Sequence, residues 1–287
     1  MGAIFKRELK NYFLNPTGYV FLSLFLLLAG IFFTTGNLLT GNTRYVGFLS
    51  SIIFIFLLIV PVLTMRLMSD ESRLKTDQLL LTTPVRISGI VLGKFLAALA
   101  FFCIGLAVTL LYAVIIAVHG ELDLWETVGG YLGFILVGGA FISVGLFISG
   151  LTENQVVAAI STFAALLVMW LIDFLQQAVP TDLTSSLVFA LLIALLVAAW
   201  LYSSTKNWIV ALATLIAGGL IILLIYLFQK ESLVGLMPRL LSWFSLLDRY
   251  RSFSSGILSL SDTVYYLSFS AFFLYLTGRT IEKRRWS

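Results

Sequence analysis

Side chains that could do chemistry are few in this sequence, and none of them forms a catalytic or metal-binding set. His119 is the single histidine, and no cysteine or paired carboxylate accompanies it at the spacing of a metal site. The stretch GIVLGK, which ends at Lys94, is one residue too short for the phosphate-binding loop GxxxxGK[ST], and Phe95 replaces its serine or threonine. We therefore expect no catalytic residue, no metal and no cofactor in this chain.

Charged side chains are concentrated in one stretch, residues 66–86, with the sequence RLMSDESRLKTDQLLLTTPVR. The sequence predicts a short amphipathic helix from about Ser69 to Thr82, with a serine cap and acidic residues in its first turn. Charges four residues apart, as at Glu71 and Lys75, allow ion pairs along its surface. Three leucines seven residues apart would share its apolar face: Leu67, Leu74 and Leu81.

The elements that must hold this stretch are apolar. The chain has 287 residues, of which 60% are hydrophobic and only 11% charged, and its mean hydropathy is +1.04. Soluble domains carry about 25% charged residues, so this composition excludes a soluble fold and indicates a membrane protein. Lipid offers no partner to unpaired backbone groups, so each apolar run must be a helix. The expected fold class is an all-α polytopic membrane protein.

Gaps between charges divide the chain into about eight spans, since a membrane helix needs about 20 apolar residues. They lie at about 19–39, 46–65, 95–118, 129–149, 153–173, 182–206, 206–230 and 262–279. Six spans is the alternative, with the pair at 187–229 in doubt. In the fourth span, Gly129 and Gly133 form a GxxxG pair, which suits either packing within the chain or a subunit interface.

The distribution of basic residues orients these spans. A cytoplasmic N-terminus places thirteen of the eighteen Lys and Arg residues on the cytoplasmic side and five outside, in agreement with the positive-inside rule. Both termini and the segment 66–94 then lie in the cytoplasm. The rule does not separate eight spans from six, because removing one pair leaves the orientation unchanged.

Two further segments are expected to lie on the membrane surface. In residues 1–15, Lys6, Arg7 and Lys10 face away from an apolar side that includes Phe5, which is typical of an interfacial helix. The segment 230–262 is too charged to span comfortably, since a central charge costs about 2.5–3.5 kcal/mol. We expect it outside, as one or two short interfacial helices that could cap a pathway or hold an external accessory protein.

The middles of the spans are almost free of Asp, Glu, Lys and Arg. Ion-coupled carriers usually keep ionisable residues at this depth. The sequence therefore disfavours an ion-coupled carrier, and the energy for any work must enter from outside the membrane.

Three stretches together resemble the permeases of ABC-2 type transporters. TMRLMSDESRLKTDQLLLTTPVRISGIVLGKF (64–95) is similar to their hallmark segment between spans two and three, and NPTGYVFLSLFLLLAGIFF (15–33) to the entry into their first span. DTVYYLSFSAFFLYLTGRTIEKRRW (262–286) resembles the last span and tail of the gliding-motility-type subgroup. The family usually has six spans, so the apolar pair at 187–229 departs from its pattern.

The resemblance implies a single ABC-2 type transmembrane domain over residues 1–287, in a bacterial plasma membrane. It implies two permease subunits, alike or paralogous, that work with two separate ATPase subunits, which bind ATP and Mg²⁺. The helix near 69–82 would be the coupling helix seated on the ATPase, and no nucleic acid is expected as a partner. The contact residues implied by this match are Asp70, Glu71, Arg73, Leu74, Thr76, Asp77, Leu80 and Leu81.

Two functions remain open from the sequence. The first is the membrane subunit of an ABC exporter, which is not itself an enzyme. The second is a non-transporting membrane scaffold, or a subunit that transmits force to an external partner through 230–262. The sequence does not specify the substrate.

Overall fold

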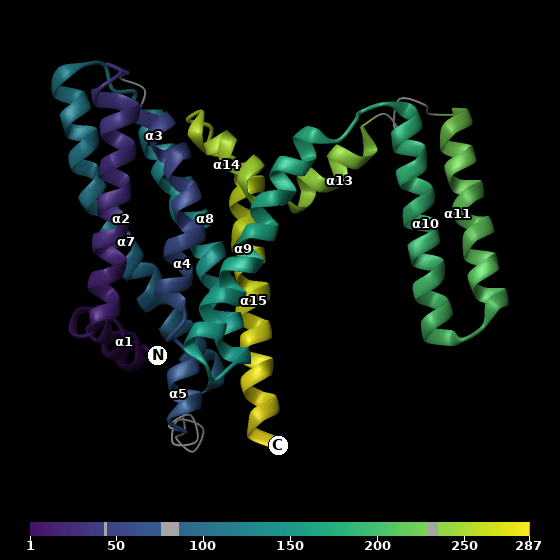
Figure 1. Ribbon diagram of the computed structural model, residues 1–287, viewed down its shortest axis with the longest axis horizontal. Helices are drawn as coiled ribbons and strands as arrows, with labels where there is room; N and C mark the ends of the chain where they lie inside the picture. The colour runs from purple at the N-terminus through teal and green to yellow at the C-terminus, as the bar shows by residue number, and fades with distance from the viewer. Residues whose placement is uncertain (43–44, 76–85, 229–234, 287) are drawn as a thin grey trace. The chain divides into compact units, whose positions relative to one another are not determined.

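The computed structural model describes residues 1–42, 45–75, 86–228 and 235–286 (Figure 1). Within these ranges the chain is helical and contains no strand, so the expected all-α fold is confirmed. The helices form two compact units, Met1–Val168 with Leu246–Ser287, and Met169–Ser245.

The first unit contains most of the helices. They are α1 (Gly2–Leu14), α2 (Pro16–Phe33), the π-helical η1 (Thr34–Leu38), α3 (Tyr45–Ile52), the 3-10 helix η2 (Ile53–Ile55), α4 (Phe56–Thr64), α5 (Ser69–Arg73), α7 (Ile87–His119), α8 (Leu124–Leu151), α14 (Leu246–Ser254) and α15 (Leu260–Trp286). The helix α9 (Gln155–Ala178) begins in this unit and ends in the second. The second unit also holds α10 (Leu183–Thr205), α11 (Trp208–Phe228) and α13 (Leu236–Phe244).

Seven helical segments of the described chain are long and apolar enough to cross a membrane, by length and composition. They are Pro16–Leu38, Gly47–Arg73, Ile87–His119, Leu124–Leu151, Gln155–Gln176, Leu183–Thr205 and Trp208–Phe228. The pair that the sequence left in doubt forms two continuous helices, α10 and α11, which does not support the six-span alternative. The expected eighth span is α15, a helix of 27 residues whose many Tyr, Ser and Thr side chains make it less apolar than the seven.

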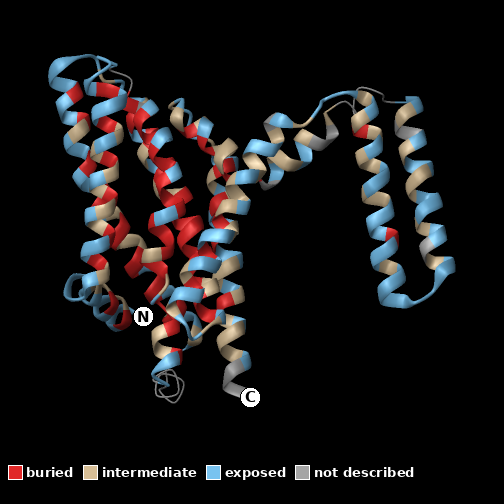
Figure 2. Cartoon of the chain, in the orientation of Figure 1, coloured by how far each residue is buried: buried red, intermediate tan, exposed pale blue. Residues whose placement is uncertain are grey.

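The core of the first unit is built around α8, which packs against α15, α14, α4 and α7. Small residues let these helices approach closely: a Cβ added at Gly133 would lie 2.6 Å from Cβ of Phe253 on α14. The GxxxG pair therefore serves packing within the chain. Beside it, Phe56 of α4 is fully buried against a cluster of aromatic rings from α7 and α8. Figure 2 shows this buried core.

In the second unit, α10 and α11 pair as a hairpin that turns at Lys206, which has a left-handed backbone with φ of 50°. Small residues make the contact, since a Cβ at Gly218 would lie 3.1 Å from Cβ of Ala194. Most of the large apolar residues described on both helices are exposed (Figure 2). Lipid is the natural surrounding for such a surface.

The two expected interfacial segments are helical where the structure describes them. The helix α1 ends at Asn15, which is extended, and Pro16 then opens α2. Lys6, Arg7 and Lys10 are exposed. The segment 230–262 forms two short helices, α13 and α14, although 229–234 lie outside the described residues.

One end of the first unit gathers several of these features. The helices α1 and α5 and the C-terminal end of α15 all lie there (Figure 1). The predicted polar stretch and the predicted interfacial helix are therefore neighbours in space.

Candidate functional site

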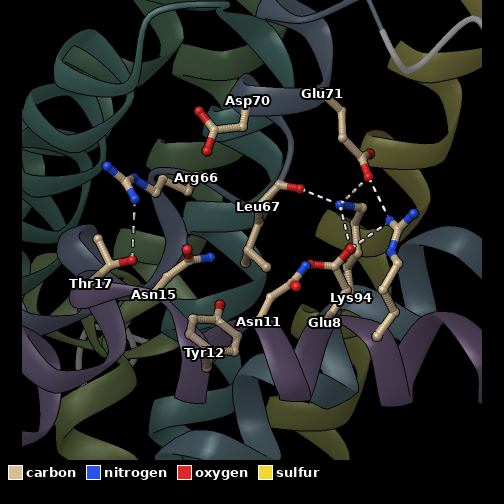
Figure 3. A pocket seen from close by; sticks show the side chains of 11 residues that line it. Glu8, Asn11, Tyr12, Asn15, Thr17, Arg66, Leu67, Asp70, Glu71 and Lys94 are labelled. Carbon is tan, nitrogen blue, oxygen red and sulfur yellow. Dashed lines mark hydrogen bonds and ion pairs between the residues drawn. The ribbon is translucent and has the colours of Figure 1, made fainter.

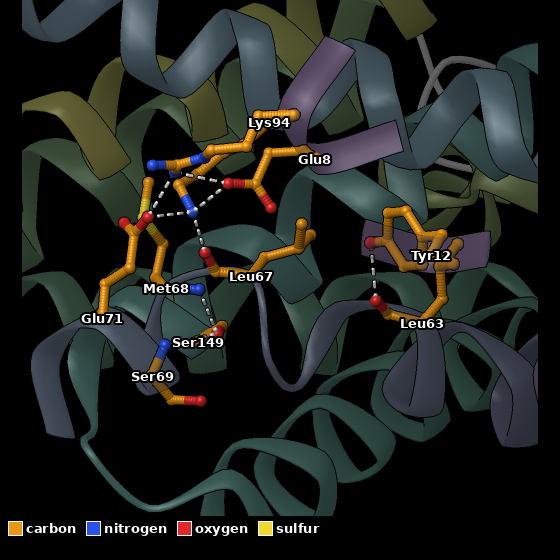
Figure 4. Close-up of polar contacts among 10 residues, drawn as sticks. Glu8, Tyr12, Leu63, Leu67, Met68, Ser69, Glu71, Lys94 and Ser149 are labelled. Carbon is orange, nitrogen blue, oxygen red and sulfur yellow. Dashed lines mark hydrogen bonds and ion pairs between the residues drawn. The ribbon is translucent and has the colours of Figure 1, made fainter. Parts of the chain in front are cut away.

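Lys94 is the centre of an ion cluster buried where α1, α5 and α7 meet (Figure 4). Its side chain is only 2% exposed, and its Nζ lies 3.0 Å from Oε1 of Glu71 and 3.3 Å from Oε1 of Glu8. The same Nζ donates a 2.5 Å hydrogen bond to the carbonyl oxygen of Leu67, in the turn before α5. A buried ammonium group must be paired and hydrogen-bonded to be stable, and these three oxygens meet that requirement.

Arg7 completes the cluster from α1. Its Nη2 lies 2.6 Å from Oε1 of Glu8 and 2.7 Å from Oε1 of Glu71. Burial alone would lower the pKa of the Arg7 guanidinium, but the hydrogen bonds and charges of the two carboxylates outweigh it and raise that pKa. Two basic and two acidic side chains thus meet in one cluster, and their formal charges balance.

A close approach of α1 to α7 makes this pairing possible. A Cβ added at Gly93 would lie 3.1 Å from Cγ2 of Ile4, which is tighter than an ordinary contact. Glu8 follows Ile4 by one helical turn on the same face of α1, and both residues are buried. The glycine beside Lys94 therefore lets α1 bring its carboxylate to the ammonium group.

Asp70, the other carboxylate of α5, meets a different set of helices. The side-chain amide nitrogen of Gln155, the first residue of α9, donates a hydrogen bond to Oδ1 of Asp70. The amide oxygen of Gln155 accepts a 3.0 Å hydrogen bond from Nε of Arg66. Arg66 also donates to Oγ1 of Thr17 on α2 at 3.5 Å (Figure 3). Asp70 is thus linked to α9, whereas Glu71 is linked to α1 and α7.

Ser149 of α8 holds the turn that leads into α5. Its buried Oγ accepts hydrogen bonds from the backbone amides of Met68 and Ser69 at 3.1 and 3.2 Å. It also donates to the carbonyl oxygen of Met65 at 3.1 Å. A single hydroxyl group therefore satisfies three backbone groups at the break between α4 and α5, which fixes the place where α5 begins.

A cavity of about 230 Å³ opens between α1 and α5 (Figure 3). Its lining combines three cations, three carboxylates and several uncharged polar groups. They are Arg7, Glu8, Asn11, Tyr12, Asn15, Thr17, Arg66, Leu67, Asp70, Glu71 and Lys94. Because the charges are balanced and already paired, this arrangement is suited to holding helices together rather than to acid–base or nucleophilic chemistry.

The helix α5 is shorter than the sequence predicts. The expected helix runs from Ser69 to Thr82, but α5 ends at Arg73, and Lys75 has a left-handed backbone with φ of 55°. Of the three leucines on the predicted apolar face, Leu81 lies outside the described residues, and the other two differ in burial. Leu67 is buried in the turn before α5, whereas Leu74 is 64% exposed.

The structure separates the proposed contact residues into three groups. Asp70 and Glu71 point back to the membrane helices, while Arg73 is 60% exposed in its side chain and Leu74 is exposed beside it. The remaining four lie outside the described residues: Thr76, Asp77, Leu80 and Leu81. On α1, Lys6 and Lys10 are exposed and Phe5 is partly buried.

Sequence reasoning missed four residues of this site: Glu8, Lys94, Ser149 and Gln155. Two of them carry a signal. Lys94 is a lone cation within an apolar helix, and Glu8 is a lone carboxylate on the apolar side of α1, so each needs a buried partner. Ser149 and Gln155 are ordinary helix-end residues, and nothing in the sequence separates them from others of their kind.

The fold and this site define a polytopic α-helical membrane protein with a short polar helix projecting between its second and third spans. Residues 8–205 match the sequence model of a family described as ABC-2 family transporter protein. That match covers more than half of the chain, so the chain belongs to the ABC-2 family and is a permease component of an ABC transporter. Such a component works in general with an ABC ATPase. No curated protein matches the chain.

Proposed function

We propose that this chain is the membrane-spanning subunit of an ATP-driven exporter, coupled to separate ATPase subunits through α5 and the residues that follow it. The supporting observation is that the end of α5 exposes Arg73 and its C-cap residue Leu74, while the first residues of α5 contact α1, α7, α8 and α9. A force applied to α5 would reach all four helices.

The proposed assembly contains two permease subunits, as a homodimer or with a paralogue, and two ATPases that bind ATP and Mg²⁺. The ATPase contacts are proposed at the exposed residues Arg73 and Leu74 and at 76–85. Contacts by Asp70 and Glu71, and membership of the gliding-motility-type subgroup, stay predictions from the family resemblance.

Copurification tests this coupling. The full-length chain, extracted in mild detergent from cells of its source, should retain a subunit that hydrolyses ATP. Leu74→Asp should lower the amount of that subunit at least tenfold, because a charge replaces an apolar contact. Leu39→Asp alters another exposed leucine, in the turn after η1, and should leave the amount unchanged. A monodisperse wild-type sample without any ATPase would contradict the proposal.

The direction of transport is tested in inverted membrane vesicles, with fluorescent lipids and amphipathic dyes as probes. An exporter accumulates a probe inside such vesicles when ATP is added outside. Hydrolysis of ATP with no movement of any probe would instead favour the scaffold alternative.

The proposed orientation places both termini in the cytoplasm of a bacterial cell. The shared location of α1, α5 and the end of α15 supports it, together with the excess of basic residues there (Figure 1). In a Cys103→Ala background, a cysteine at Glu121 should react with an impermeant maleimide on intact cells. A cysteine at Glu282 should react only after permeabilisation, and the reverse pattern would refute the orientation.

A further inference from the structure

We propose that Lys94 and Gln155 are positioning residues that divide the movement of α5 between two sets of membrane helices. Lys94 would transmit movement from Glu71 to α7 and α1, and Gln155 would transmit movement from Asp70 to α9. This inference rests on the proposed function, in which an ATPase moves α5.

The two carboxylates of α5 have different partners. Successive residues of an α-helix point about 100° apart, so the side chains of Asp70 and Glu71 leave α5 in different directions. The contacts follow this geometry: Glu71 meets Arg7 and Lys94, while Asp70 meets Gln155. We call these the α7 arm and the α9 arm.

The α7 arm is rigid because it is buried and shared. The ammonium group of Lys94 holds two carboxylates and the carbonyl oxygen of Leu67 at once. Separating a charge from its partners at a buried site is costly, so α7 and α1 should follow Glu71 rather than let it go. Arg7 contacts the same two carboxylates and couples α1 to this movement.

The α9 arm depends on an amide group. Gln155 donates to the carboxylate of Asp70 through its nitrogen and accepts from the guanidinium of Arg66 through its oxygen. A carboxylate at this position would keep Arg66 but repel Asp70, and an aliphatic side chain would lose both contacts. Gln155 is the first residue of α9, so a displacement of Asp70 acts on the end of that helix.

Ser149 supplies the point about which the arms can move. It holds the backbone on both sides of the start of α5, and it belongs to α8, the most buried of the seven candidate spans. With its root fixed on α8, α5 can tilt, and a tilt displaces its two carboxylates in different directions.

The arms can be tested separately by electron paramagnetic resonance on the full-length chain, copurified with its ATPase and placed in nanodiscs. In a Cys103→Ala background, spin labels at Ser88 of α7 or Ile160 of α9 are each paired with one at Leu132 of α8. All three positions are exposed. Distances are measured without nucleotide and with Mg-ATP and vanadate.

In the otherwise wild-type chain both distances should shift with nucleotide. Lys94→Met should abolish the α7 shift and keep the α9 shift, and Gln155→Leu should do the opposite. Each should leave copurification of the ATPase within twofold of the wild type. Lys94→Arg keeps the positive charge and should therefore restore most of the α7 shift. If Lys94 were needed only for folding, Lys94→Met in a folded sample would not abolish the α7 shift alone.

Gln155→Glu keeps the inference testable if the Lys94 variants fail to fold. Gln155 is partly exposed at the end of α9, so this substitution should not prevent folding. It should weaken the α9 shift alone. Loss of both shifts in either variant, or of neither, would overturn the inference while leaving the proposed function intact. A wild-type chain that captures no ATPase would overturn the proposed function, and the inference with it.

Discussion

The helices α8 and α11 are alike in sequence character and opposite in environment. Their most apolar windows have mean hydropathies of 2.2 and 2.7, yet 72% of the α8 window is buried within the protein and none of the α11 window. In a membrane, apolar side chains gain little by leaving lipid for protein. Hydropathy therefore says that a helix lies in the membrane and does not say what surrounds it there.

Shape and polar contacts make the difference. The helix α8 presents glycines and a serine to its neighbours, so that α14 and the turn before α5 fit closely against it. The hairpin of α10 and α11 uses its small residues for its own internal contact and leaves most of its large apolar residues exposed.

The largest expected effect comes from removing a core ring. Phe56→Ala should leave a cavity among Phe102, Phe134 and Phe141, whose ring centroids lie 5.4, 4.5 and 5.9 Å from that of Phe56. We expect a loss of about 3 kcal/mol in unfolding free energy, the lower end of the range for soluble cores because lipid also solvates the ring. Thermal unfolding in detergent measures it.

Leu195→Ala on α10 is the matched control, because this side chain is exposed on the hairpin. Its midpoint of unfolding should stay close to the wild type. An equal loss in the two variants would mean that the hairpin is packed as tightly as the core.

The next effect comes from filling a close approach. Gly133→Ala would place a methyl group 2.6 Å from Cβ of Phe253, an atom fixed to the backbone of α14. Such overpacking should cost about 1–3 kcal/mol. Gly219→Ala on α11 meets no atom within 4 Å, so it should be neutral or stabilise its helix by up to about 1 kcal/mol. The midpoint of thermal unfolding should therefore fall for Gly133→Ala and stay the same or rise for Gly219→Ala.

An effect of the same expected size as that of Gly133→Ala separates two buried serines. Ser149→Ala removes three hydrogen bonds to the turn before α5 and should cost about 1–3 kcal/mol, since buried backbone groups lose their partner. Ser186 of α10 is equally buried, and its hydroxyl has no hydrogen-bond partner among the described residues. Ser186→Ala should leave stability unchanged or raise it. A larger loss at Ser186 than at Ser149 would reverse the comparison.

Much of the fold was predictable because lipid restricts the choices. Seven of the eight expected spans, the break at Asn15-Pro16 and the short helices at 236–254 follow from charge spacing and from the need to satisfy every backbone group inside the membrane. The polar helix begins at Ser69 as predicted, but the predicted serine cap is wrong, because the N-cap residue is Met68 and no side chain caps the helix. These features depend on residues that are near one another in the sequence.

The site was predictable only in its location. Sequence spacing suggested that Glu71 pairs with Lys75, four residues away, but the helix ends before Lys75 and Glu71 meets Arg7 and Lys94. The partners of Asp70 and of the turn before α5, Gln155 and Ser149, lie about 80 residues further along the chain. No local pattern specifies contacts of that kind.

Residue spacing, charge and run length are enough to predict a helical membrane protein with one polar helix between its second and third spans, because each of these features acts within a single segment; the quoted segments add the resemblance to the ABC-2 family. The packed structure adds that both carboxylates of the polar helix turn back to the membrane helices, that Lys94 is buried among them, and that α8 is a core helix while α11 is not. Those outcomes depend on which helices meet, and in lipid that is settled by close packing and charge pairing across the fold.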